Sequence, residues 1–232
     1  MKQLMVVQHT SADYLGLMED HLEARRIRFQ YFRPFANDGK LPDRNALGDG
    51  LILLGGGPWG SAGERDVPNL DTEVSLARVC LMMDKPVIGI GLGAQILTIA
   101  ADGKTSAAPL AFRVGHATRK TDDALNGYLP PRYPHVIFMR DRPEPPAYAR
   151  ILSESDDGRP AIFQVGPKAF GFVGHPGFKL AMAEDLLMEF EEAPENPAPQ
   201  LAALGGIKRE IEDALVPIMT GLVQMTGLMD EK

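Results

Sequence analysis

Three short apolar runs constrain the fold of this chain more than any other feature: Leu4–Val7, Leu51–Leu54 and Val87–Ile90. Apolar residues follow one another in these runs instead of alternating with polar ones, which is typical of strands buried on both faces of a parallel sheet. Arg28–Phe32 is predicted to be a further strand. We expect all four segments to lie parallel to each other in one sheet.

The segments between these strands show the spacing of helices. Apolar residues recur at three- and four-residue steps and predict amphipathic helices over residues 15–22, 70–83 and 95–100. Ser11 or Asp13 is placed to cap the first of them. An alternation of strands and helices of this kind predicts an α/β fold with a doubly wound, mostly parallel sheet.

The pattern changes in the middle of the chain. Short apolar runs at residues 136–139, 161–164 and 170–173 are separated by turns, which favours antiparallel or mixed pairing. Arg142–Pro146 contains three prolines and is predicted to be a loop, because proline lacks the N–H that a ladder of hydrogen bonds needs. The middle segment is therefore predicted to add a small antiparallel extension to the sheet.

The C-terminal part is predicted to be helical with one break. Leu180–Phe190 is predicted to be a helix, and Glu191–Gln200, with three prolines, a linker. Apolar residues from Ile207 to Leu222 then form a helical stripe. We expect residues 1–190 to form one domain and residues 191–232 to add a linker and a helix packed on that same domain.

Composition excludes several classes of protein. The 232 residues carry a net charge of −7, and an acidic chain is a poor binder of nucleic acid. Cys80 is the one cysteine, so an internal disulfide or a multi-cysteine zinc site is excluded. No apolar run approaches the roughly 20 residues of a membrane helix. We expect a cytoplasmic protein without metal, cofactor or membrane contact.

Glycine-rich turns follow two of the predicted strands. Gly55-Gly56-Gly57-Pro58 either forms a nest of backbone N–H groups for an anion or is only a tight turn. The second turn is Gly89-Ile90-Gly91-Leu92-Gly93, and Ile96 stands where a dinucleotide-binding fingerprint would need glycine. Its other interpretation is a nucleophile elbow, but the central residue, Gly91, has no side chain.

Histidines end two strands on the predicted site edge of the sheet. His175 lies in a glycine-flanked turn, Gly174-His175-Pro176-Gly177, after a late strand. His9 directly follows the first strand. Cys80 lies in the helix before the elbow strand, and we interpret it as a buried, unreactive thiol.

In order and spacing, these motifs resemble those of class I glutamine amidotransferase domains. The chain has Gly-Gly-Pro after a strand, then Lys85-Pro86-Val87-Ile88-Gly89-Ile90 before the elbow, and later His175-Pro176. The likeness covers about residues 1–190 and is greatest to the stand-alone branch related to the glutaminase half of GMP synthetase. It implies a flavodoxin-like sheet with a small antiparallel extension.

The resemblance also implies roles for individual residues. In the family a cysteine at the elbow attacks glutamine, a histidine takes the thiol proton, and a glutamate orients the histidine. His175 matches the histidine, but Gly91 stands at the nucleophile and Gly177 at the acid. The positions matching the oxyanion hole and ligand site are Gly56, Gly57, Pro58, Leu92 and Gln95. The histidine–aspartate signature of the family is replaced in the segment Phe138–Asp141.

Three functions are compatible with this sequence. The leading hypothesis is an amidotransferase-like protein without glutaminase activity that serves as a binding, regulatory or complex subunit. It would bind a small molecule or a glutamine-like ligand, a synthase-type partner subunit or a second copy of itself. One alternative is an enzyme of different chemistry that uses His175 as a base. The other is a glutamine-hydrolysing enzyme with an unidentified nucleophile.

Overall fold

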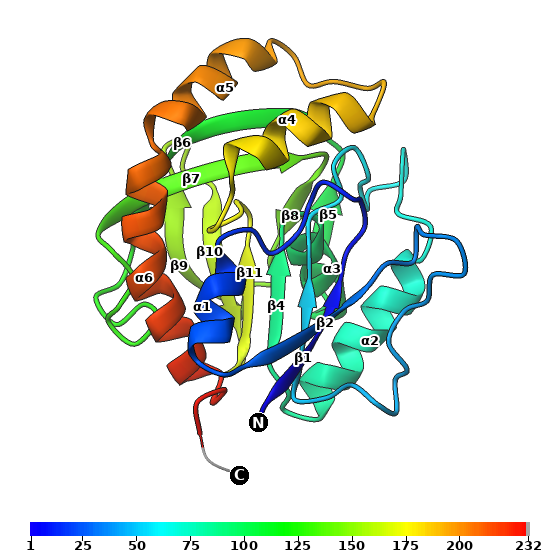
Figure 1. Ribbon diagram of the computed structural model, residues 1–232. Helices are drawn as coiled ribbons and strands as arrows, with labels where there is room; N and C mark the ends of the chain where they lie inside the picture. The colour runs from blue at the N-terminus through cyan, green and yellow to red at the C-terminus, as the bar shows by residue number, and fades with distance from the viewer. Residues whose placement is uncertain (231–232) are drawn as a thin grey trace.

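A computed structural model describes residues 1–230 and shows a central sheet covered by helices on both faces (Figure 1). The strands are β1 Gln3–Val7, β2 Arg28–Phe32, β3 Gly50–Leu53, β4 Val87–Ile90, β5 Lys104–Ser106, β6 Ala111–Arg119, β7 Arg132–Met139, β8 Arg142–Glu144, β9 Arg150–Ser155, β10 Pro160–Val165 and β11 Ala169–Phe172. The helices are α1 Met18–Ala24, α2 Leu70–Met82, α3 Leu92–Ala100, α4 Leu180–Glu189, α5 Pro197–Gly206 and α6 Lys208–Met225.

The large sheet has a parallel half and an antiparallel half. Its strand order is β2-β1-β3-β4-β11-β10-β9-β6-β7, and β2, β1, β3, β4 and β11 are mutually parallel. From β11 onward the pairing is antiparallel, through β10, β9, β6 and β7. The predicted parallel sheet with an antiparallel extension is therefore confirmed, and the four predicted parallel strands are β1, β2, β3 and β4.

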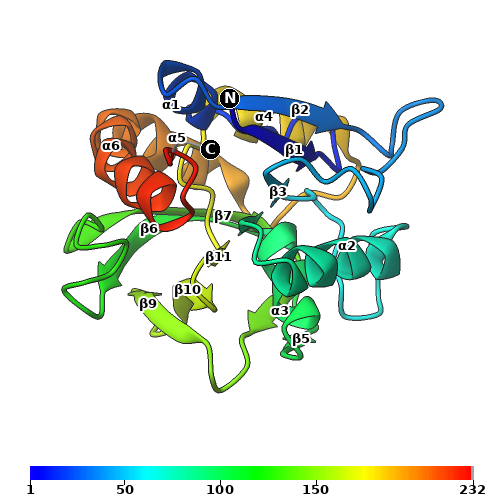
Figure 2. The ribbon, with the colours of Figure 1, turned by 90° about the horizontal axis from the view of Figure 1, so that it is seen from below.

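Alternate residues of the apolar strands β1, β3 and β4 enter opposite cores, which explains why these three runs are unbroken. Leu4 and Val6 pack in the core with Leu22 of α1 and Leu215 of α6. Met5 and Val7 belong instead to the core that includes α2 and α3. Figure 2 shows α1 and α6 on one face of the sheet and α2 and α3 on the other. Both faces of a strand are then buried, so both must be apolar.

The first helix is shorter than predicted and has no side-chain cap. It begins at Met18, and neither Ser11 nor Asp13 caps it. Gly16, with φ +61°, lies in the loop that precedes the helix. Both polar residues are used elsewhere: Ser11 bonds to Glu189, and the Asp13 carboxylate lies against Gly55.

Two predictions based on proline are wrong. Part of the predicted Arg142–Pro146 loop is β8, which pairs only with β5 in a two-stranded sheet. An edge strand of this kind leaves alternate N–H groups outside the ladder, so Pro143 is tolerated. Part of the predicted Glu191–Gln200 linker is the first turn of α5. Prolines fit that turn because its N–H groups have no partner within a helix.

None of the helices described for residues 1–230 is long and apolar enough to cross a membrane. The C-terminal helix α6 contacts β7, α1 and α5. The predicted helices over 70–83, 95–100 and 180–190 correspond to α2, the later part of α3 and α4.

Candidate functional site

The turn after β4 has the backbone geometry of a nucleophile elbow. Gly91 has φ +56° and ψ −113°, and α3 begins directly after it at Leu92. This region of φ and ψ is open to glycine and strained for other residues. A Cβ placed on Gly91 would meet Gly55 Cα at 3.4 Å as its nearest neighbour, which is ordinary van der Waals contact. The elbow therefore has room for the base of a side chain but carries none.

The Gly-Gly-Pro turn packs so closely against this elbow that few side-chain atoms lie between the two backbones. A Cβ on Gly56 would lie 2.5 Å from Leu92 Cδ2, and one on Gly93 would lie 1.9 Å from Leu53 O. The Gly93 N–H donates to Leu54 O at 3.1 Å. The two predicted glycine turns are thus brought together, and the Leu53 carbonyl leaves no room for a side chain at position 93.

Gln95 holds this region together through its side-chain amide. Buried in α3, it donates from Nε2 to Arg140 O at 2.6 Å and accepts from Ser61 Oγ at 2.5 Å. Both ends of the amide are therefore bonded to the protein. In this structure the predicted ligand-binding residue acts as a link between two loops.

Asp141, in the segment Phe138–Asp141, also holds the loop at Ser61 through hydrogen bonds of its carboxylate. Its Oδ2 accepts from the backbone N–H of Ser61 at 2.9 Å and of Ala62 at 3.1 Å, and its Oδ1 accepts from Ala108 N–H at 3.1 Å. The side chain is fully buried. The preceding residue, Arg140, donates to Pro58 O at 2.9 Å and pairs with Glu192.

The strand that precedes His175 adjoins the elbow, because the Phe172 carbonyl accepts the Gly91 N–H. Both ring nitrogens of His175 form hydrogen bonds within the protein. The Gly177 N–H donates to Nδ1 at 3.1 Å, which assigns the ring proton to Nε2, and Nε2 donates to Tyr14 O at 2.8 Å. Burial lowers the pKa of His175 to about 4, so the ring is neutral at neutral pH. No lone pair of this ring is free to accept a proton.

Backbone atoms of the loop before α1 lie directly beside Gly177. Gly177 O accepts the Leu17 N–H at 3.0 Å, and a Cβ on Gly177 would lie 3.1 Å from the Met18 nitrogen. The loop before α1 therefore occupies the space beside Gly177. The Tyr14 carbonyl of that loop orients the imidazole through Nε2.

Three buried polar side chains, His9, Asp13 and Glu73, form a cluster beside Gly55. His9, which sequence analysis singled out, contacts Gly55 O at 3.1 Å through Nδ1 and Glu73 Oε2 at 2.6 Å through Nε2. Burial alone lowers the pKa of His9, but Glu73 and the Gly55 carbonyl outweigh it and raise the pKa above its ordinary value. An imidazolium that donates from both nitrogens fits these partners.

Asp13 completes this cluster. Burial raises its pKa to about 7, although His9 and a backbone hydrogen bond from Gly55 act in the opposite direction. The sequence pattern indicates Asp13 only as a helix cap and indicates no role for Glu73. Helical spacing was the available signal for Glu73, since it precedes Ala77 by four residues and Cys80 by seven on the buried side of α2.

The raised pKa of Asp13 predicts a specific pH dependence. Between about pH 4 and pH 7 the folded state holds a proton that the unfolded chain has released, so this group's contribution to stability is lost as the pH rises. Asp13→Asn removes the titration. Its free energy of unfolding, minus that of the wild type, should therefore grow by a few kcal/mol from about pH 4 to pH 8, at about 1.4 kcal/mol per pKa unit. Urea denaturation at a series of pH values measures the difference, and a constant difference would contradict the prediction.

Cys80 is confirmed as a buried thiol. It lies in α2 with no exposed surface, among apolar residues of the core. Burial raises its pKa to about 11 against a small lowering by Lys85, so the thiolate is not formed at neutral pH. Within residues 1–230, no group of three histidine, cysteine, aspartate or glutamate side chains is placed to hold a metal ion.

Curated proteins similar to this chain include two types of glutamine-related enzyme. Gamma-glutamyl peptidase 3 of Arabidopsis thaliana is 30% identical over 186 residues, which are 74% of this chain and 72% of the relative. The glutamine-hydrolysing GMP synthase of Aeropyrum pernix is 28% identical over 226 residues, which are 89% of this chain but only 41% of the synthase. No family model matches the sequence.

Solved structures with the same fold cover nearly the whole chain. The glutamine amidotransferase of Methylobacillus flagellatus superposes with a TM-score of 0.81 at 19% identity, over 97% of this chain and 95% of its own. The glutamine amidotransferase of Thermotoga maritima gives a TM-score of 0.80 at 20% identity, over 97% of this chain and 98% of its own. These two structures show that the fold of this chain is the fold of solved glutamine amidotransferases. The chain belongs to the class I glutamine amidotransferase-like family.

Proposed function

We propose that this protein has lost glutamine hydrolysis and serves as a binding or regulatory subunit built on the amidotransferase scaffold. The observation that carries the proposal is Gly91, which stands at the elbow with no side chain to attack an amide. Loss of the nucleophile removes the covalent step, and loss of one member of a catalytic triad costs several orders of magnitude in rate.

The state of His175 supports the same proposal. A general base needs a free lone pair, and here Nδ1 accepts from Gly177 N–H while Nε2 donates to Tyr14 O. A pKa of about 4 also makes the ring a weak base. These observations disfavour the alternative in which His175 serves as the base of a different reaction in the same cleft.

A substitute nucleophile is also disfavoured. Cys80 is buried, with a pKa near 11. Ser61 lies closer to the site, but its Oγ donates to Gln95 Oε1, and no histidine bonds to it among the described residues. Neither side chain has the adjacent base that activates a nucleophile.

Two substrates test the proposal directly. Glutamine is the family's substrate, and a γ-glutamyl dipeptide follows from the name of the Arabidopsis relative. Purified protein should release neither ammonia or glutamate from the first nor an amino acid from the second above the rate without protein. An active glutamine amidotransferase serves as positive control. Release in proportion to protein, retained through purification, would overturn the proposal.

A binding or regulatory subunit should associate with a second copy of this chain, with a partner protein or with a small ligand, and the purified protein can be tested for each. Light scattering after gel filtration distinguishes a monomer from a second copy of this chain. Affinity capture followed by mass spectrometry identifies a synthase-type partner. A protein that neither self-associates nor retains a partner or small ligand would contradict the subunit role, though not the loss of hydrolysis.

A substitution at the elbow tests whether glycine now stabilises the fold. Gly91→Cys and Gly91→Ala should each lower the free energy of unfolding by about 1–3 kcal/mol, because a Cβ at φ +56° and ψ −113° strains the backbone. Gly206→Cys is the matched control, since Gly206 is at the exposed end of α5 with open space around it and should tolerate the change. Thermal unfolding measures all three variants. An elbow variant more stable than the wild type would contradict the expectation.

A further inference from the structure

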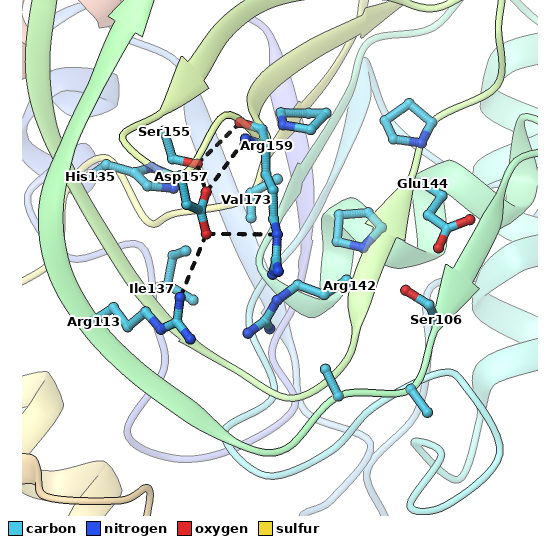
Figure 3. A pocket seen from close by; sticks show the side chains of 15 residues that line it. Ser106, Arg113, His135, Ile137, Arg142, Glu144, Ser155, Asp157, Arg159 and Val173 are labelled. Atoms are coloured by element: carbon cyan, nitrogen blue, oxygen red, sulfur yellow. Dashed lines mark hydrogen bonds and ion pairs between the residues drawn. The ribbon is translucent and has the colours of Figure 1, made fainter.

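A cavity of about 550 Å³ lies in the antiparallel part of the molecule, separate from the elbow (Figure 3). Its walls come from the segments after β5 and around β8, from β6 and β7, and from the turn between β9 and β10. Gly91 and His175 do not line it. Its volume is within the range of small-molecule sites.

Three arginines converge on this cavity. Arg113 extends from β6, Arg142 from β8, and Arg159 from the turn before β10. Figure 3 shows the three guanidinium groups approaching the same part of the cavity, with Glu144 on the opposite wall. Three like charges in one cavity repel each other. Their convergence is unusual for a chain whose net charge is −7.

The acidic groups of the cavity offset only part of this charge. Asp157 accepts from Ser155 Oγ at 2.6 Å, but its Oδ2 lies 3.6 Å from Arg113 Nη1 and 3.7 Å from Arg159 Nε. Both arginine distances exceed that of a charged hydrogen bond. Glu144 is the only other acidic residue of the lining. The formal charge of the lining is therefore positive.

Arg142 has the least compensated charge of the three. Its Nη1 donates to the backbone carbonyl of Asp141 at 2.8 Å, and within residues 1–230 no carboxylate lies within ion-pair distance. Burial and then the neighbouring cations Arg159 and Arg113 lower the pKa of Arg142. A guanidinium still presents several donors when one N–H is bonded, so Arg142 retains donors for a ligand.

Much of the remaining lining is apolar. Ile137 and Val173 contribute aliphatic side chains, and Pro143, Pro145 and Pro160 contribute rings. A site with few charged groups on a mainly apolar surface is typical of pockets for small organic molecules.

We propose that this cavity binds a small organic anion whose phosphate or carboxylate group is held by Arg113, Arg142 and Arg159. Arginine recognises both groups through paired N–H···O bonds. The apolar wall would contact the organic part of the ligand. Arg142 follows Asp141, whose carboxylate accepts the Ser61 N–H in the loop near the elbow. A ligand bound to Arg142 would therefore lie one residue from the hydrogen bonds that hold this loop. This proposed anion site does not rest on the proposal that glutamine hydrolysis has been lost.

Calorimetric titration of the full chain with inorganic phosphate and with succinate tests the proposal. Each probe is added at constant ionic strength, so that general screening does not change. We expect saturable binding of at least one probe, and the stronger of the two identifies the preferred anionic group. Arg142→Gln should weaken that binding about tenfold or more, since a hydrogen bond to a charged group is lost.

Arg150→Gln is the matched control for the change of charge. Arg150 pairs with Asp123 outside the cavity, and its replacement should leave the affinity within about twofold. Arg159→Gln provides a second cavity variant if Arg142→Gln does not fold. Absence of saturable binding of both probes would overturn the proposal, and so would an equal effect of the cavity and control substitutions. Because no substrate turnover is measured, this result is independent of the glutaminase assay.

Discussion

Replacing Asp141 with alanine is expected to lower the free energy of unfolding by about 3–6 kcal/mol. The substitution leaves three backbone N–H groups without an acceptor, at Ser61, Ala62 and Ala108. The bond from Ser61 is buried and those from Ala62 and Ala108 are partly buried. A buried donor that loses its partner costs about 1–3 kcal/mol, and a partly exposed donor costs less because water can replace the acceptor. Urea denaturation of wild type and Asp141→Ala measures the difference.

Two further variants make this prediction specific. Asp141→Asn keeps one side-chain oxygen and should give an intermediate loss. Asp122→Ala changes a fully exposed aspartate and should stay within about 0.5 kcal/mol of the wild type. A loss below about 1 kcal/mol for Asp141→Ala would mean that water or a shifted loop satisfies the three donors.

Replacing Glu73 with alanine should have a similarly large effect. The carboxylate is fully buried against His9 Nε2 at 2.6 Å, and removing one partner of a buried pair costs about 3–5 kcal/mol. Glu73→Gln keeps the volume and an acceptor oxygen and should cost less. Chemical denaturation again gives the values.

The pH dependence of Glu73→Ala distinguishes an ionic pair from simple packing. Because the pKa of His9 in the folded protein is raised, its contribution is fully present below about pH 6.5 and is lost as the pH rises through the raised value. Glu73→Ala should therefore lose most stability below about pH 6.5 and less at alkaline pH. An effect independent of pH would show that His9 is neutral.

The parallel half of the fold could be predicted from the sequence because a strand buried on both faces has an unbroken run of apolar residues. Leu51 and Leu53 enter one core while Ile52 and Leu54 enter the other, so no polar residue interrupts the run. The strands β6 and β9 could not be found in this way. Along β6 buried positions such as Phe112 alternate with exposed ones such as Arg113 over only part of its length.

The site was predictable where a role depends on backbone position and not where it depends on contacts distant in sequence. Gly91 follows a strand and precedes a helix, so its place at an elbow can be inferred from neighbours alone. The state of His175 depends on Tyr14, 161 residues earlier, and no local pattern indicates this contact. Asp13 was taken for a helix cap for the same reason, since its buried neighbour Gly55 lies in another loop.

The contact between Gly177 and the loop before α1 leaves little room for a glutamate side chain at position 177. A glutamate there would bring its Cβ to 3.1 Å from the Met18 nitrogen, and the loop would have to shift. The Tyr14 carbonyl already accepts the Nε2 proton of His175. We therefore expect Gly91→Cys to gain a thiol but little or no hydrolysis of glutamine.

Intact-mass spectrometry after incubation with a diazoketone analogue of glutamine tests the central claim most directly, because the reagent alkylates an active-site nucleophile. An active glutamine amidotransferase serves as the positive control and gains one adduct. We expect the wild-type protein to keep its unmodified mass. A stoichiometric adduct on the wild-type chain, mapped to any residue beside the elbow, would contradict it.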